Sequence, residues 1–134
     1  MKNKQFLTIF VASIIMVFQI CAQNVAEIEK LLNESVSYTY GKNRQNLNKI
    51  EDLIRKTQND SERRQIEQLL ARGLLKENAT VEFKEFICRQ LWYLGTSQSV
   101  NAVSTLFTNE STVGWACYAL TRNPSKEAEV ALVN

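Results

Sequence analysis

Apolar residues recur at intervals of three and four along most of the chain, the spacing that places side chains on one face of an α-helix. Short polar stretches separate these segments. The pattern predicts helices over about residues 24–37, 44–57, 60–75, 81–94, 97–107, 110–120 and 124–132. No alternating strand pattern has a pairing partner, so the predicted fold class is all-α.

Polar residues mark where the predicted helices begin, because their side chains can accept a bond from a free N–H of the first turn. The predicted caps are Asn59 or Asp60, Thr80, Thr96 or Ser97, Asn109, and Asn123 followed by Pro124 in the first turn. Asn33, Asn59, Asn78 and Asn109 also match the glycosylation sequon, but we interpret these motifs mainly as capping signals.

Glycines are expected to mark breaks and close approaches. Gly41 suits a left-handed residue that closes the first helix, and Gly95 is expected to end the fourth. Gly73 lies inside a helical pattern, where it costs about 1 kcal/mol relative to alanine. It predicts either a close helix crossing or an early helix end.

Two segments near the C-terminus carry the same pattern. Cys88 and Cys117, Leu91 and Leu120, and Gly95 and Pro124 each lie 29 residues apart. A constant offset across two helices and the breaker between them is typical of stacked repeats. The short loops favour antiparallel hairpins, with both leucines of this pattern in the core.

Composition fits a single globular domain, with 134 residues, 45% hydrophobic and 22% charged. The formal charge is +2, but Lys2 and Lys4 belong to the leader described below, and without them it is zero. Nothing therefore indicates a nucleic-acid-binding surface, and no nucleic-acid partner is expected.

The chain contains no histidine, so it lacks the commonest general base and the commonest metal ligand. Glu51 and Asp52 are adjacent on a charged helix face and do not converge on a cleft. Cys88 and Cys117 without a histidine make a poor metal site. We expect no enzyme activity, no cofactor and no metal.

The first 22 residues have the layout of a secretory signal peptide. Lys2 and Lys4 precede an apolar run over residues 6–18, and the small residue Ala22 closes the segment. We expect cleavage after Ala22, a mature chain of residues 23–134 without a membrane span, and a periplasmic or extracellular location. An uncleaved anchor is one alternative. Lipidation at Cys21 is disfavoured because Ile20, not a small residue, precedes it.

The repeat motifs resemble a known family. Ala116-Cys117-Tyr118-Ala119-Leu120, Pro124 and Ala128-x-x-x-Leu132 are similar to the HEAT-like repeats of the armadillo-type superfamily, and more narrowly to the short repeats related to phycobilisome lyases. Ile87-Cys88-Arg89-Gln90-Leu91-x-x-x-Gly95, Tyr40-Gly41-x-x-Arg44 and Asn46-Leu47 resemble exported bacterial HEAT-repeat proteins. Cys117 departs from the pattern, which usually has arginine there.

The resemblance implies a right-handed α-α superhelix, or solenoid, of antiparallel helical hairpins. Residues 23–134 would form an N-terminal helix and about three hairpins, either as a short array or as a fragment of a longer one. The implied function is a non-catalytic scaffold that binds a protein partner. The alternative is a ligand-binding or lyase-type subunit similar to the bilin lyases, against which the absence of histidine counts.

Several aromatic residues could line a binding surface. Trp92, Tyr93 and Tyr118 flank the apolar stripes of their helices, so they are the candidate interaction residues. Phe83, Phe86 and Phe107 are expected in the core.

The two cysteines beyond the leader are Cys88 and Cys117. Equivalent positions on stacked helices lie roughly 8–10 Å apart, beyond the 7 Å or so that a disulfide allows. We expect both cysteines to be reduced and buried.

Overall fold

The computed structural model describes residues 23–133, so the predicted signal peptide over residues 1–22 lies outside the described part. The described chain begins in a helix over residues 23–35. It continues with α2 (Gln45–Lys56), α3 (Asp60–Leu74), α4 (Val81–Leu94), α5 (Ser97–Ser104), the 3-10 helix η1 (Thr105–Thr108), α6 (Val113–Leu120) and α7 (Lys126–Val133). Residues 23–133 contain no strand, which confirms the all-α prediction.

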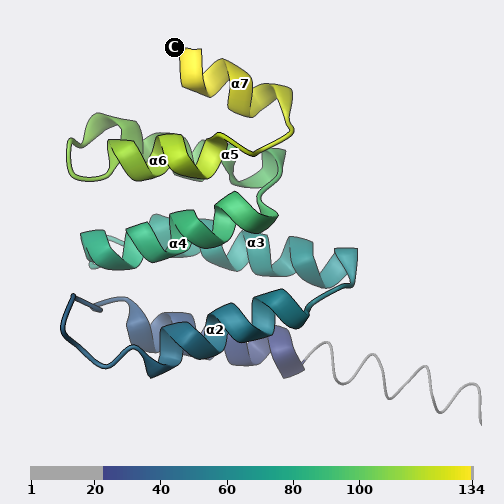
Figure 1. Cartoon of the computed structure of the whole chain (residues 1–134), viewed down its shortest axis with the longest axis vertical. Coiled ribbons are helices and arrows are strands. Elements are labelled where there is room, and N and C mark those ends of the chain that lie inside the picture. Colours follow the sequence, from purple (N-terminus) through teal and green to yellow (C-terminus); the bar gives the residue numbers. More distant parts are fainter. Residues whose placement is uncertain (1–22, 134) are drawn as a thin grey trace, which may run out of the picture.

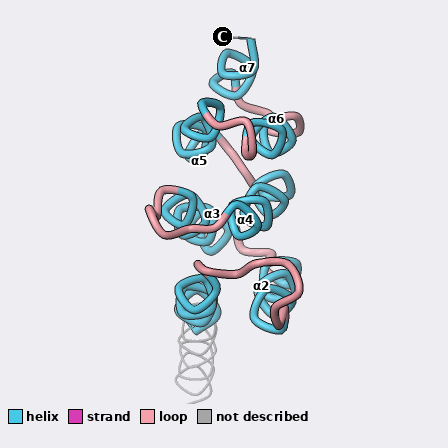
Figure 2. Tube along the Cα trace, turned by 90° about the vertical axis from the view of Figure 1, so that its left-hand side faces the viewer, coloured by secondary structure: helices cyan, strands magenta, loops and turns pink. Residues whose placement is uncertain are grey.

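The helices lie in successive layers (Figure 1). The helix over residues 23–35 and α2 form one layer, α3 and α4 the next, and α5 and α6 the third, with α7 above them. Seen from the side, the layers form two columns (Figure 2). Contacts between α3, α5 and α7 connect one column, and contacts between α2, α4 and α6 connect the other.

One core runs through these layers, because each helix turns its apolar stripe toward its neighbours. Leu91 of α4 and Leu120 of α6 are both buried, as their shared place in the repeated pattern predicts. Phe83 and Phe86 are also buried, and Phe107 is half-buried against the core.

Three of the predicted caps are confirmed. The side-chain oxygen of Asn59 accepts the Glu62 N–H at 3.1 Å, and that of Thr80 accepts the Phe83 N–H at 3.2 Å. Thr96 is the residue before α5, and its hydroxyl accepts from the Gln98 N–H.

Two predicted helix starts are wrong. Thr112, not Asn109, immediately precedes α6, and the Asn109 side chain instead accepts the Ser111 N–H at 2.8 Å in the preceding turn. α7 starts after Pro124, at Lys126, and the hydroxyl of Ser125 accepts its first-turn bond from Ala128. In both places the asparagine side chain bonds to the backbone two residues ahead, a local turn that competes with helix.

Gly41 is explained by its backbone conformation, and Gly73 by the lack of space for a side chain. Gly41 has φ of 85°, which confirms the left-handed conformation, but the helix before it ends at residue 35, so Gly41 shapes the connecting loop. Gly73 marks a close crossing of α3 and α4, because a Cβ there would lie 2.7 Å from Cδ1 of Ile87. Of the two readings of Gly73, the structure supports the crossing.

A buried carboxylate connects the second layer to the third. Glu67 of α3 is 1% exposed, and it accepts the backbone N–H groups of Thr96 at 2.6 Å and Ser99 at 3.2 Å. These N–H groups belong to the start of α5, where the helix dipole favours a negative charge. The side chain of one layer therefore caps a helix of the next.

Candidate interaction surface

Three aromatic side chains meet where α6 packs on α4. The rings of Trp92 and Tyr118 are stacked, with centroids 5.6 Å apart and planes 16° apart. Trp115 meets Tyr118 edge to face, with centroids 6.2 Å apart. Both arrangements are favourable geometries for aromatic pairs.

Arginine side chains lie at both ends of this aromatic group. The Cζ atom of Arg122 is 4.8 Å from the centroid of the Trp92 ring, and that of Arg89 is 5.2 Å from the centroid of Trp115. Each is within the range of a cation–π interaction. The contacts follow the order Arg122, Trp92, Tyr118, Trp115, Arg89, and we name these five residues the aromatic–arginine cluster.

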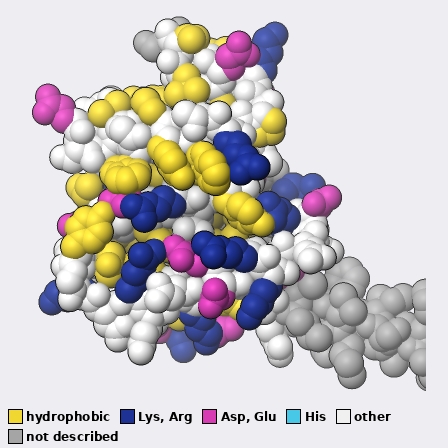
Figure 3. Space-filling model, viewed as in Figure 1, with side chains coloured by type: hydrophobic (Ala, Val, Ile, Leu, Met, Phe, Trp, Pro, Cys, Tyr) yellow, Lys and Arg dark blue, Asp and Glu magenta, His cyan; other side chains and the backbone are white. Residues whose placement is uncertain are grey.

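The cluster lies on the surface. Arg89 and Arg122 are exposed, Tyr118 is 39% exposed, and the two tryptophans are half-buried. Figure 3 shows hydrophobic side chains next to Lys and Arg side chains on the face that α4 and α6 present in Figure 1. The cluster therefore combines aromatic surface with positive charge.

The carboxylates beside the cluster already have partners. Glu85, which is largely buried, forms an ion pair with Arg89 and accepts a hydrogen bond from the hydroxyl of Tyr40. That hydrogen bond raises the pKa of the Tyr40 phenol. Glu51 of α2 pairs with Arg44 at 2.8 Å and accepts a bond from Gln90.

The structure brings together two of the three predicted interaction residues. Trp92 and Tyr118 are stacked, whereas Tyr93 makes no ring contact with them and instead packs under Arg63, 5.2 Å from its Cζ. Adjacent residues point in different directions around a helix, which separates Tyr93 from Trp92.

Three members of the cluster were missing from the predicted set: Arg89, Trp115 and Arg122. A helical signal for two of them is present in the sequence. Trp92 follows Arg89 by three positions and Tyr118 follows Trp115 by three, which is a spacing of neighbours on a helix surface. Arg122 lies beyond the end of α6, so the helical spacing does not predict its place.

Cys88 and Cys117 are both free. Cys88 is fully buried, and burial, aided by the charge of Glu85, raises the pKa of its thiol to about 12. Cys117 is only half-buried, so the prediction of two buried thiols is wrong for this residue.

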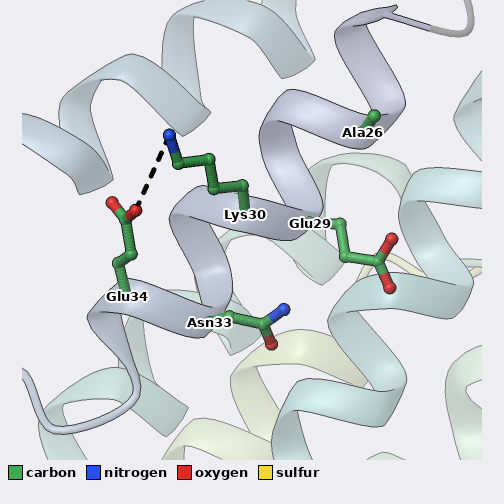
Figure 4. Close-up of a pocket in the computed structure, with 5 residues that line it drawn as sticks. All are labelled: Ala26, Glu29, Lys30, Asn33 and Glu34. Atoms are coloured by element: carbon green, nitrogen blue, oxygen red, sulfur yellow. Dashed lines mark ion pairs between the residues drawn. The ribbon is translucent and has the colours of Figure 1, made fainter.

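A shallow hollow, apart from the cluster, lies on the helix over residues 23–35 (Figure 4). Its lining residues, Ala26, Glu29, Lys30, Asn33 and Glu34, are all exposed and come from one helix. Lys30 and Glu34 form an ion pair at 4.0 Å, of the exposed kind that contributes little. This shallow surface offers no set of converging groups.

Two further searches cover residues 23–133. No three or more Cys, Asp or Glu side chains in this range are grouped so that they could hold a metal ion. Within the same range, every helix is too short or too polar to cross a bilayer.

No family model, curated protein or solved structure gives a significant match to this chain. The resemblance to HEAT-like repeats therefore rests on the sequence motifs. The aromatic–arginine cluster is the most distinctive feature of the described surface.

Proposed function

We propose that this chain is an exported, non-catalytic scaffold that binds a protein partner. The observation that carries the proposal is the aromatic–arginine cluster on α4 and α6. Tryptophan, tyrosine and arginine are the residue types that dominate binding energy in protein interfaces. Export rests on the leader motif over residues 1–22.

The layered helices support a solenoid of HEAT-like repeats as the architecture of this scaffold. In a solenoid each repeat contacts its neighbours, and successive repeats together build an extended binding surface. The cluster follows this principle, because Trp92 comes from α4 in one layer and Tyr118 from α6 in the next. A partner that binds there would contact two layers at once, so binding would require α4 and α6 to be packed together.

The alternative of a ligand-binding or lyase-type subunit has less support. A flat apolar ligand would need a slot between aromatic rings. Trp92 and Tyr118 instead stack on each other, so their facing surfaces are already occupied.

The scaffold proposal can be tested by cross-linking in extract of the source cells, followed by affinity measurements with each purified cross-linked partner. Wild type, the double variant W92A/Y118A and the control Y93A are compared. Tyr93 is a matched control, since it is an exposed tyrosine of α4 that lies outside the cluster. Circular dichroism verifies that all three proteins are folded.

The expected result is a partner that binds wild type and Y93A equally and binds W92A/Y118A at least about tenfold more weakly, the loss expected for hot-spot residues. A partner that binds the folded double variant with unchanged affinity would place the binding surface elsewhere. Loss of binding in Y93A alone would show that the binding surface lies on the side of α4 that faces Arg63.

A further inference from the structure

The charge of the aromatic–arginine cluster indicates which kind of partner it binds, an inference that rests on the proposed function. Arg122 is held over Trp92, and within residues 23–133 it forms no ion pair. A guanidinium packed against a ring keeps its full charge and its fork of N–H donors. Arg122 is thus positioned to receive a carboxylate from outside the described chain.

Two carboxylates beside the cluster already have partners of their own. Glu85 is held by Arg89 and Tyr40, and Glu51 by Arg44 and Gln90. Arg89 is paired with Glu85 and Arg122 has no ion pair within residues 23–133, so the cluster keeps one unpaired positive charge.

The order of contacts suggests a pattern for the ligand. Three aromatic rings lie between two guanidiniums, with Arg122 at one end and Arg89 at the other. Because Arg89 is already paired with Glu85, a complementary segment has an apolar stretch and acidic residues at the end that meets Arg122. Carboxylates suit arginine because the planar guanidinium can bind both oxygens at once.

We propose that the cluster binds a short acidic segment of a partner protein, with a carboxylate at Arg122 and apolar side chains against Tyr118 and Trp115. A nucleic acid is the less favoured anion. Long polyanions are bound by extended basic surfaces, whereas residues 23–134 have no net formal charge.

The test uses a fluorescent peptide with three acidic residues on each side of a Leu-Phe-Leu centre, so that an acidic end can reach Arg122 in either orientation. Two control peptides keep the centre and replace the acidic residues by their amides or by lysine, and oligothymidine is the competing polyanion. Fluorescence anisotropy measures binding to the full chain and to the variants R122Q and Y93A. Arg122 is exposed, so R122Q should leave the fold intact, which circular dichroism verifies.

We expect the acidic peptide to bind at least about tenfold more tightly than its amide version, and R122Q to weaken it by about tenfold, because a charge-assisted hydrogen bond is lost. Y93A should bind as wild type does. Added salt should weaken binding, since the contacted charges are exposed.

Equal binding of the acidic and amide peptides, or unchanged binding by R122Q, would overturn the acidic preference. Tighter binding of oligothymidine than of the acidic peptide would assign the surface to nucleic acid instead. These failures differ from failure of the scaffold proposal. If binding of the cross-linked partner still requires Trp92 and Tyr118, the scaffold proposal is retained and only the preference for an acidic segment is rejected.

Discussion

The carboxylate of Glu67 accepts the backbone N–H of Thr96 at 2.6 Å, which places a side chain of α3 at the first turn of α5. The Thr96 hydroxyl donates to the same carboxylate, and the Thr96 carbonyl accepts a bond from the Asn123 side chain at 2.8 Å. Thr96 thereby links the helix layer before it to the segment that leads into α7.

Glu67→Ala should be strongly destabilising, because it leaves the N–H groups of Thr96 and Ser99 without their acceptor. We expect a loss of about 1.5–3 kcal/mol, the range for hydrogen bonds to a charged group. Glu67→Gln keeps an acceptor and should lose less. Urea unfolding measures both, with exposed Glu77→Ala as the control. A Glu67→Ala variant as stable as this control would show that the buried carboxylate does not hold the layers.

Leu91→Ala and Leu120→Ala should each cost about 2–5 kcal/mol, since both leucines are buried in the core. Leu75→Ala is the matched control, because that side chain is 57% exposed. Thermal or urea unfolding followed by circular dichroism gives the comparison. If either core variant behaved like Leu75→Ala, its place in the repeated pattern would be wrong.

Gly73→Ala should be destabilising even though alanine is the better helix former by about 1 kcal/mol. The new methyl group would lie 2.7 Å from Cδ1 of Ile87, and overpacking of a core typically costs about 1–3 kcal/mol. Gly114→Ala in α6 is the control. No neighbouring atom lies within 4 Å of the added Cβ there, so this change should be neutral or stabilising.

A double-mutant cycle isolates the contact at Gly73. Ile87→Val removes Cδ1, so the double variant Gly73→Ala/Ile87→Val should be more stable than the sum of the single losses predicts. Additive losses would mean that the cost of Gly73→Ala arises elsewhere than at Ile87.

The Cys88 thiol should make stability fall at alkaline pH. Its pKa is about 12 in the folded chain and 9.0 for an unperturbed thiol. Below about pH 9 the thiol is protonated in both states, so the free energy of unfolding does not depend on it. Between about pH 9 and 12 it ionises only in the unfolded chain, which lowers the free energy of unfolding as pH rises.

The pH dependence of the free energy of unfolding is compared between wild type and Cys88→Ala. The tyrosines and lysines are the same in both proteins, so their titration cancels in the comparison. Urea unfolding at pH 8 and pH 10.5 should show a larger loss for wild type. In native protein, Cys88 should also react with a thiol reagent more slowly than half-buried Cys117. Equal losses in the two proteins, with equal reaction rates, would contradict burial of Cys88.

Helix positions could be predicted from the sequence because periodicity and capping are local. Asn59 and Thr80 cap helices as expected, since the bonds they make reach only three residues ahead. Asn109 and Asn123 were expected to cap helices for the same reason, but their side chains form turns instead. The residue type alone does not tell a helix cap from a turn.

The surface was less predictable than the helices. Trp92 and Tyr93 look alike in the sequence, and only the packing of α6 on α4 decides that Trp92 meets Tyr118. The Glu67–Thr96 bond joins residues 29 positions apart, and it depends on how two helices stack. A pattern read along the chain contains little information about such contacts.

The stacking of neighbouring layers also has a consequence for the time course of folding. Thr96 bonds to a residue 29 positions earlier and to one 27 positions later, so the contacts between layers close loops of modest length. Helical chains, in which most contacts are local, fold fast. As the polypeptide is synthesised, each layer can find its neighbour soon after its own helices have emerged, well before the C-terminal residues are added.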